Sequence, residues 1–434
     1  MASISGSFIK SQKVISPRMG ILHSVLKLPR QASDPMSINY GVFPCDSTKL
    51  NGEKYEGRSS GCNFNIYESF MGTIGETIER YCPAFYDLSK MVRSNYKDLP
   101  YKAITPSEFS LFHEKQYSSF REKKYKIHPF DEEINLHWDK CYDLTNGKDT
   151  YCPAAFIYLP WTIEDKWILS GTSTGLAAHT NFNKAILTAL YEIIERDSFV
   201  ITWHQKLVTP KIIIDAAIQS FLDKTFPSKY EFHFFDITYD LKVPTILGFC
   251  FGESEYGKFI AIGTATRSTF SEALKKVILE ISQSVPYFRY MLGERKDWKP
   301  SEDFNELLSF EDHSVIYLKR PELQPVLDIW RNAKPSITID FQEKETRNDN
   351  EIITSIVRLF KQKNYNVLVK DITTPDANQV GYYCIRIVIP QLLQMGGAYP
   401  LYFLGGKRLY EVPEIIGYKS NSYDDLNKYP HPFP

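Results

Sequence analysis

The chain has 434 residues, of which 43% are hydrophobic and 14% are aromatic, and its formal net charge is −1. This composition is typical of a folded globular protein, and its scattered, balanced charges give no indication of binding to nucleic acid or anionic membranes. No apolar run reaches the ~18 residues of a membrane span, and the N-terminus lacks a signal-peptide core. The seven cysteines are widely spaced and include no C-x-x-C pair, so we expect a cytoplasmic protein with reduced thiols and no Cys-rich zinc site.

The N-terminal part of the chain has no strong periodic pattern. Residues 1–54 are expected to be loop-rich, with a short extended piece around 20–28. A turn-rich run then leads into a first helix, which begins a core expected to span 55–290. The charged stretch 84–149 predicts an insertion into this core, made of solvated loops and short helices.

A unit of strand, small-residue loop and helix recurs in the middle of the chain. Residues 167–170 are expected as a strand that leads through 171–175 into a helix over 181–203. A strand over 258–264 leads through 265–269 into a further helix. Other strands are expected at 211–214, 230–237, 245–251, 365–371 and 382–388, and a helix at 352–364. Together these elements predict a mixed α/β (α+β) fold around an internal repeat.

The C-terminal part, residues 291–434, is expected to complete the domain. Its first portion, 292–346, is polar and charged, which predicts an insertion or link. The last residues, 429–434, are Tyr-Pro-His-Pro-Phe-Pro and cannot form a helix or a central strand. A proline-rich segment is already stiff and extended, so it could enter a cleft at low entropic cost.

Three predicted helices share one stripe of small and acidic residues. The stripes end in Glu76 and Glu79, in Glu192 and Glu195 and, in a weaker third copy, in Glu280 and Gln283. Residues three apart lie on one helix face, where adjacent carboxylates repel each other, and the opposite faces are apolar, as in a helix packed on a core. A solvated face would explain one such pair. Three copies favour a site at which acids from different helices converge on metal ions.

Mg²⁺ prefers one or two carboxylates together with waters and substrate phosphates. The four acids of the first two stripes could therefore hold two or more Mg²⁺ ions against a triphosphate. Arg80, Arg196 and Lys276 could complete the charge balance around the phosphates. For the two arginines, structural pairing with neighbouring acids is an equally good explanation.

The segment Gly171-Thr-Ser173-Thr-Gly175 matches the G-x-S-x-G nucleophile elbow, so a hydrolase that uses Ser173 is one alternative. An elbow turns directly into its helix, however, and here 176–180 intervene. A loop whose N–H groups and hydroxyls bind phosphate near a helix N-terminus fits better. The sequence has no Walker A or H-E-x-x-H motif, and of its nine histidines only His179, before the second acidic helix, stays a candidate.

These residues resemble the YcaO-domain family, whose ATP site uses no Walker motif. The family's first motif, Gly-x-Gly followed by Glu-x-x-Glu-Arg, corresponds here to Gly61–Asn63 with Glu76–Arg80. Its second motif, a loop followed by Glu-x-x-Glu-Arg-Asp, corresponds to Thr174–Thr180 with Glu192–Asp197. Its third motif, Glu-x-x-Gln, corresponds to Glu280–Gln283. Further similar segments are Asp371–Thr373, Gly381, Arg386–Pro390 and Gly405–Arg408.

The resemblance covers the chain from about residue 55 to its end and implies a YcaO fold, in which the helices of the repeated units converge on a nucleotide and Mg²⁺ site, with ATP and Mg²⁺ as cofactors. It implies ATP-binding roles for Gly61, Arg80, Ser173, Thr180, Arg196, Lys276, Glu280 and Gln283, and metal-ligand roles for Glu76, Glu79, Glu192 and Glu195. The chain departs from the family pattern where Thr180 replaces an Asn, Lys184 an acid, and Asn63 and His179 a Gly. These departures alter the expected nucleotide contacts.

The ending Pro430-x-Pro432-x-Pro434 resembles that of azoline-forming members, the D proteins of microcin- and streptolysin-type peptide biosynthesis. The resemblance implies an ATP-dependent cyclodehydratase that phosphorylates the backbone amide oxygen of a precursor peptide. Its Cys, Ser or Thr residues would become thiazoline or (methyl)oxazoline rings. The carboxylate of Pro434 is the candidate base for the proton transfers.

The same resemblance implies partner proteins. The chain looks too short to include a ThiF-like leader-binding module and lacks that module's Cys tetrad, so we expect a separate ThiF-like partner. An FMN-dependent dehydrogenase is expected to act on the product, and the chain could form a homodimer. Two further alternatives are a YcaO enzyme that forms thioamides or amidines and a nucleotide-binding scaffold without turnover.

Overall fold

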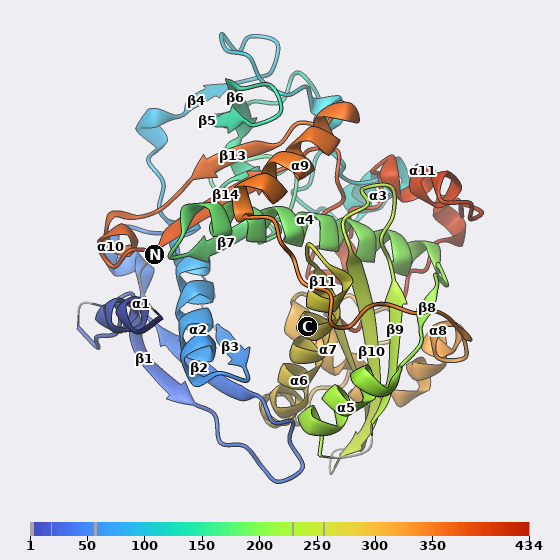
Figure 1. Cartoon of the computed structure of the whole chain (residues 1–434). Helices are drawn as coiled ribbons and strands as arrows, with labels where there is room; N and C mark the ends of the chain where they lie inside the picture. Colours follow the sequence, from blue (N-terminus) through green and yellow to red (C-terminus); the bar gives the residue numbers. More distant parts are fainter. Residues whose placement is uncertain (1–3, 19, 56–58, 228–229, 255–256, 434) are drawn as a thin grey trace.

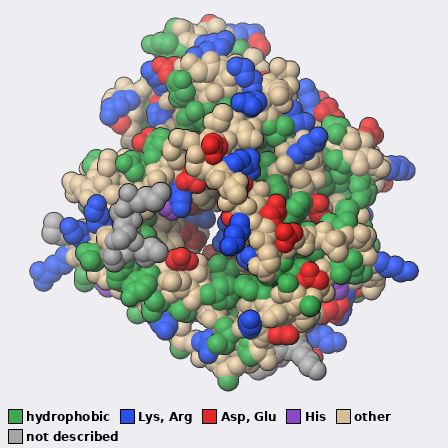
Figure 2. Space-filling view, in the orientation of Figure 1, with side chains coloured by type: hydrophobic (Ala, Val, Ile, Leu, Met, Phe, Trp, Pro, Cys, Tyr) green, Lys and Arg blue, Asp and Glu red, His purple; other side chains and the backbone are tan. Residues whose placement is uncertain are grey.

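Three β-sheets and three long helices surround a central opening in the computed structural model, which describes residues 4–18, 20–55, 59–227, 230–254 and 257–433 (Figure 1). The long helices are α2 (Ile66–Tyr81), α4 (Phe182–Gln205) and α6 (Phe270–Glu294). Figure 2 shows that side chains leave the centre of this face hollow, with both basic and acidic groups around the rim. The mixed α/β fold class predicted from the sequence is confirmed.

The N-terminal segment forms a helix and most of a small sheet, so the expectation of loop-rich structure is wrong. Its elements are α1 (Ile4–Ser11), β1 (Leu22–Lys27), β2 (Ile38–Pro44) and β3 (Ser60–Asn63), and the antiparallel strand order is β1-β2-β3. Gly61 in β3 lies directly against α2: a Cβ there would be 2.2 Å from Thr73 Oγ1 and 2.4 Å from Ser69 O. Glycine at this position therefore lets strand and helix approach closely.

A loop of the N-terminal segment closes the far side of the ring. Asp34 lies in the loop between β1 and β2 and is buried, and its Oδ2 accepts a hydrogen bond at 3.1 Å from Nη1 of Arg289 on α6. The backbone N–H of Met36 donates to the carbonyl of Thr225 at 2.8 Å. Thr225 ends α5 (Ala216–Thr225), so both bonds join the first sheet to helices that pack on the five-stranded sheet.

A six-stranded sheet takes three of its strands from residues 92–153, so the stretch 84–149 does not consist only of the expected solvated loops and short helices. Its strands are β4 (Val92–Ser94), β5 (Leu136–Asp143), β6 (Lys148–Pro153), β7 (Leu176–His179), β13 (Leu368–Asp371) and β14 (Tyr383–Val388). The path is β4-β5-β13-β14-β7, with β6 beside β5. In the second half of β5, Cys141 is buried between the exposed Lys140 and Tyr142, a short alternation that the many charges in this stretch obscured.

The expected strand at 167–170 is also wrong. The strand of this unit, β7, follows the glycine loop instead of preceding it. The remaining predicted strands and the helices at 181–203 and 352–364 are confirmed, with small shifts at their ends. The helix corresponding to 352–364 is α9 (Asp349–Gln362).

The five-stranded sheet has the order β11-β10-β9-β8-β12. Its strands are β8 (Lys211–Ile212), β9 (Glu231–Asp236), β10 (Thr245–Ser254), β11 (Gly257–Thr266) and β12 (Pro335–Ile337). Helix α6 packs on one face, where a Cβ on Gly248 would be 2.4 Å from Val277 Cγ1. Helix α4 crosses the other end and contacts β11.

The stretch 292–346 contributes to the core, so it is not only a polar link. Its helix α7 (Phe310–Lys319) buries Val315, Ile316 and Tyr317, and Trp330 of α8 (Asp328–Arg331) is 1% exposed. The remaining helices are α3 (Glu114–Glu122), α10 (Pro375–Gln379) and α11 (Arg408–Ile415). All seven cysteines are free, and among the described residues no helix is long and apolar enough to span a membrane.

Candidate functional site

The three long helices place their first acid in the same way. In each, the carboxylate accepts a hydrogen bond from a backbone N–H of the strand or loop that precedes the helix. The bonds join Ser60 N to Glu76 Oε2 at 3.3 Å, Gly175 N to Glu192 Oε2 at 3.0 Å, and Thr264 N to Glu280 Oε2 at 3.2 Å. Donor and acceptor are 16, 17 and 16 residues apart. This shared geometry is the structural form of the repeat seen in the sequence.

In two of the three stripes, the second polar residue bonds to the strand that precedes another of the three long helices. Glu195 on α4 accepts hydrogen bonds from Thr264 Oγ1 at 3.0 Å and Thr266 N at 3.1 Å, both on β11. On α6, Gln283 Nε2 donates to Ser60 Oγ on β3 at 2.8 Å. These bonds tie α4 to the strand before α6 and α6 to the strand before α2, so the acids of separate segments face one centre.

Each helix also carries a cation next to one of its acids. The distances are 3.4 Å for Arg80–Glu79, 3.6 Å for Arg196–Glu192 and 3.3 Å for Lys276–Glu280. Structural pairing, one of the two explanations offered for the arginines, therefore exists. These are loose, partly solvated contacts, and a bound anion could compete for the same cations.

Burial and mutual repulsion favour the protonated form of these carboxyl groups. Burial raises the pKa of Glu79 to about 8, against the lowering effect of Arg80, and the neighbouring Glu192 and Glu76 add to the rise. Burial also raises the pKa of Glu195 to about 8, with repulsion from Glu280 as the next cause. The pKa of Glu76 is raised, again chiefly by burial. A cation placed between these groups would stabilise their ionised forms.

The donor set fits Mg²⁺, which takes oxygen ligands. Oε1 of Glu76 and of Glu192 is not engaged by the strand bonds, which use Oε2, whereas both oxygens of Glu195 accept hydrogen bonds. Within the described part of the chain, no three His, Cys, Asp or Glu side chains could hold a metal ion by themselves. Such a site suits an ion that takes part of its shell from water and phosphate.

The glycine loop is held by a buried arginine that the sequence did not single out for this role. Arg386 on β14 is 2% exposed and donates at 3.0 Å to each of the carbonyls of Thr172 and Thr174. Gly175 has φ +87°, and a Cβ there would be 2.3 Å from Ile387 O. The loop runs into strand β7, so Ser173 does not have the strand-to-helix position of a nucleophile elbow.

Residues before α4 cap the helix. Asn181 Oδ1 accepts from Lys184 N at 3.0 Å, and His179 Nδ1 accepts from Asn181 N at 2.9 Å. Burial, followed by repulsion from Lys184, lowers the pKa of His179, so its ring is a neutral acceptor. Thr180, half-buried, lies between the cap and β7.

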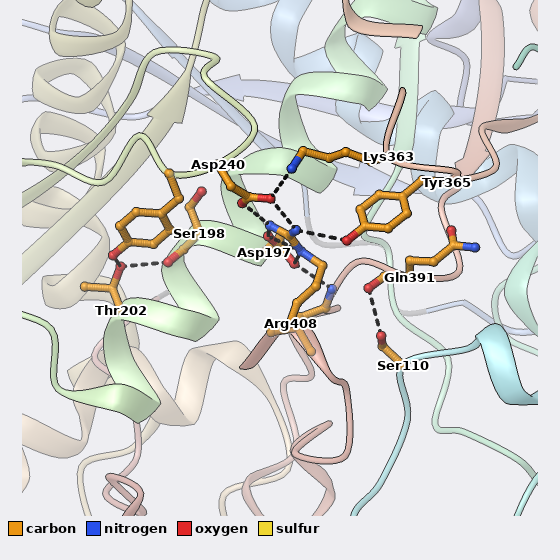
Figure 3. Close-up of polar contacts among 11 residues, drawn as sticks. Ser110, Asp197, Ser198, Thr202, Asp240, Lys363, Tyr365, Gln391 and Arg408 are labelled. Atoms are coloured by element: carbon orange, nitrogen blue, oxygen red, sulfur yellow. Dashed lines mark hydrogen bonds and ion pairs between the residues drawn. The ribbon is translucent and has the colours of Figure 1, made fainter. Parts of the chain in front are cut away.

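A buried ion-pair network anchors the acidic helix immediately after Arg196 (Figure 3). Arg408 of α11 binds Asp197 Oδ2 at 2.7 Å and Asp240 Oδ1 at 2.8 Å, and all three side chains are at most 4% exposed. Lys363 binds Asp240 at 2.8 Å. Through Arg408, the motif residue Asp197 thus connects α4 with the segments of Asp240 and Lys363, a role that its position beside Glu195 and Arg196 did not predict.

The C-terminal segment lies against the same helix. Residues 430–433 are buried, and the guanidinium of Arg196 stacks on Phe433 at 4.3 Å from the ring centre. Phe310 lies at 5.8 Å from the same guanidinium. Among the described residues, buried Nε of Arg196 has no hydrogen-bond partner. Pro434, the predicted catalytic residue, lies outside the described residues.

Comparisons with known proteins identify this arrangement. Residues 61–393 match the family model described as YcaO cyclodehydratase, ATP- and Mg²⁺-binding. A heterocyclase in complex with substrate and cofactor has a TM-score of 0.79 and 20% identity, with 100% of this chain and 57% of that chain covered. The present chain thus spans just over half of that protein.

Two further structures have the same fold. YcaO from Methanopyrus kandleri bound with AMPPCP and Mg²⁺ has a TM-score of 0.62 and 14% identity, covering 90% of both chains. A chain of the E. coli microcin synthetase McbBCD complex with pro-MccB17 bound has a TM-score of 0.61 and 16% identity, covering 97% of this chain and 99% of that one. No curated protein sequence matches the chain.

Proposed function

Because the chain belongs to the YcaO family, we propose that it is an ATP- and Mg²⁺-dependent peptide cyclodehydratase. The observation that carries this proposal is the convergence of three acid-bearing helices, each fixed by the same strand-to-carboxylate hydrogen bond. Such a ring of carboxylates and loosely paired cations suits a triphosphate better than it suits a neutral ligand. The neighbours bound with AMPPCP and Mg²⁺ and with a precursor peptide support the proposal.

Glu76, Glu79, Glu192 and Glu195 would hold Mg²⁺, and Glu76 and Glu192 each have an oxygen free of the strand bonds. When bound, Mg²⁺ neutralises phosphate charge and orients the transferring group. Arg80, Arg196 and Lys276 would offset the remaining charge. The other proposed ATP-binding residues are Gly61, Ser173, Thr180, Glu280 and Gln283. The Arg386-supported loop presents Ser173 to the nucleotide, and Gly61 contributes by letting β3 lie on α2.

The proposed reaction closes a ring in the peptide backbone. A Cys, Ser or Thr side chain attacks the preceding carbonyl carbon and gives up its proton, and the oxygen of the adduct takes the γ-phosphoryl group of ATP. Loss of the amide N–H proton and of phosphate then leaves the C=N bond of an azoline, with ADP and phosphate as products. The chain supplies position and charge rather than a covalent nucleophile.

Proton transfer in this scheme is assigned to the end of the chain. We propose the carboxylate of Pro434 as the base, because the neighbouring Phe433 contacts Arg196 on the acidic helix. A positioned base of this kind typically contributes about 10²–10⁴-fold. A YcaO enzyme that forms thioamides or amidines would use the same ATP site but gives no reason for burying the tail.

Partner proteins complete the proposal. The matched part is 57% of the longer heterocyclase, which leaves less than half of that chain beyond the match, and the microcin synthetase neighbour is a complex. We therefore expect a separate ThiF-like protein to bind the precursor's leader, an FMN-dependent dehydrogenase to act afterwards, and a cytoplasmic location. A homodimer is compatible with these assignments.

The test is a mass measurement. A candidate precursor peptide is incubated with this protein, the ThiF-like partner, ATP and Mg²⁺, and each ring formed removes the mass of one water. Omitting ATP is the control. An unchanged peptide with the complete mixture, while ATP is consumed, would favour another YcaO reaction, and hydrolysis that depends on Ser173 would favour the hydrolase alternative.

A further inference from the structure

Five consecutive backbone carbonyls near the C-terminus each accept a hydrogen bond from a different side chain. The pairs are Asn427 O with His204 Nδ1 at 2.8 Å, Lys428 O with Tyr399 Oη at 2.7 Å, Tyr429 O with Trp203 Nε1 at 3.0 Å, Pro430 O with Tyr317 Oη at 2.6 Å, and His431 O with His313 Nδ1 at 3.1 Å. Because a carbonyl only accepts, both histidines carry their proton on Nδ1 here.

We propose that these five side chains, the carbonyl cradle, are positioning residues that set the register of the tail and so place the end of the chain beside Arg196. This inference rests on the proposed function for its catalytic consequence. An extended proline-rich segment has no internal hydrogen bonds, so the carbonyls of its buried residues, Asn427, Pro430 and His431, need donors from elsewhere. The cradle supplies one donor to every residue from 427 to 431.

The donors come from elements that are rigid and that already build the site. Trp203 and His204 lie at the end of α4, whose middle carries the acidic pair Glu192 and Glu195. His313 and Tyr317 lie on α7, the helix that also brings Phe310 to Arg196. The distance along α4 from the acids to the cradle is therefore fixed by the helix itself. This distance in turn sets the position of the tail relative to the acids.

Ring packing holds the segment laterally. The ring of His431 stacks on His313 with centres 4.2 Å apart, and Tyr402 lies on it at 5.5 Å. Phe433 packs on Phe199 at 5.3 Å. The carbonyl bonds define which residue occupies which position, and the rings exclude water around them, so a broken bond leaves a buried carbonyl unpaired.

The test uses full-length protein and a matched pair of tyrosine variants. Tyr317→Phe removes the hydroxyl that donates to Pro430 O, whereas Tyr410→Phe removes a hydroxyl that donates at 2.7 Å to Leu404 O, outside the tail. A 4-fluorophenylalanine at position 433 reports the seating of the tail by ¹⁹F NMR without requiring activity. We expect saturation transfer to detect roughly 5- to 150-fold more unseated tail in Tyr317→Phe, and no change in Tyr410→Phe.

The catalytic consequence has its own readout. Tyr317→Phe should lower the number of rings formed per ATP consumed about fivefold or more and leave KM for ATP unchanged. His313→Asn, which keeps a donor where Nδ1 was, should retain more coupling than His313→Leu, which has similar volume and no donor. A structural role alone would lower both variants alike.

Equal populations of unseated tail in Tyr317→Phe and Tyr410→Phe would contradict the proposed role of the cradle. An equal number of rings formed per ATP consumed in the two His313 variants would contradict it as well. If the unmodified protein forms no rings at all, the proposed function fails, and the ¹⁹F comparison still decides whether the cradle seats the tail.

Discussion

The hydroxyl of Thr264 donates a hydrogen bond to Oε1 of Glu195 at 3.0 Å, joining residues 69 positions apart in the chain. Thr264 is also the residue whose N–H binds Glu280. One strand residue thus holds an acid of α4 with its side chain and an acid of α6 with its backbone. Thr264 therefore helps to set the relative position of two acid-bearing helices, together with Thr266, whose N–H also donates to Glu195.

Thr264→Val should therefore impair the site without unfolding the protein. The substitution keeps the shape of the buried side chain and removes the hydroxyl, leaving one oxygen of Glu195 unpaired at a cost of about 1–3 kcal/mol. We expect a lower apparent affinity for Mg²⁺ and a 10- to 100-fold lower rate of ATP consumption. Thr264→Ser, which keeps the donor, is the control, and equal rates for the two variants would contradict the proposed role of this bond.

Glu76→Gln or Glu192→Gln should abolish ATP consumption while the fold survives. The amide oxygen of Gln can still accept the strand N–H, so the helix stays anchored, but the negative charge that a metal needs is lost. ATPase assays and thermal melts measure the two effects separately. The exposed Glu272→Gln on α6 is a control of the same chemistry away from the centre. Near-normal turnover in both site variants would refute the carboxylate model.

Ser173→Ala should lose less than about 100-fold in activity. The loop is positioned by Arg386 through the carbonyls of Thr172 and Thr174, so removal of the Ser173 hydroxyl costs one hydrogen bond at most. Steady-state rates of ATP consumption decide the matter. A loss near a million-fold, as for a catalytic serine, would instead support the hydrolase alternative.

A bulky extension at the C-terminus should stop ring formation. Residues 430–433 are buried and Phe433 contacts Arg196, so added chain has to pass through the site or displace the tail. We expect a loss of about 10²–10⁴-fold or more, the contribution of one positioned base, with nucleotide binding less affected. Deletion of 430–434 should have the same effect on cyclisation and a larger effect on stability. Cyclisation by a tagged protein at the untagged rate would argue against an azoline-forming role for the tail.

The metal-free protein should lose stability as pH rises from 7 to 8. Glu79 and Glu195 have a pKa of about 8 in the folded chain, against an ordinary pKa of 4.5, so the folded state binds more protons in this interval and ionisation favours unfolding. The low pKa values of His204 and His313, about 4 because of burial, act only below their ordinary value of 6.5.

Urea titrations at pH 7 and pH 8 with a chelator measure this effect, which should reach about 1 kcal/mol per pH unit. Saturating Mg²⁺ with a non-hydrolysable nucleotide should flatten the slope, since bound cations keep the carboxyls ionised in the folded state as they are in the unfolded chain. A flat or rising profile without metal would show that these carboxyls are not held protonated by the fold.

Local pattern determined much of what is seen here. The spacing of Glu76 and Glu79, of Glu192 and Glu195, and of Glu280 and Gln283 places each pair on one helix face by the geometry of the helix alone, and the apolar opposite faces specify which side packs. The strands that alternate cleanly or are continuously apolar were predicted for the same reason. The stretch 84–149 was not, because charges in turns between its strands outweighed the alternation of β5.

Only the tertiary structure decided what those side chains meet. Thr264 and Glu195, Arg408 and Asp197, and Tyr317 and Pro430 are 69, 211 and 113 positions apart, and no periodicity relates residues at such distances. Their contacts follow from how the sheets and long helices close into a ring, since a hydrogen bond requires donor and acceptor within about 3 Å. The sequence therefore determined the acidic faces and the stiff, proline-rich end, and the closure of the fold determined that they meet, because only packing sets the distance between remote segments.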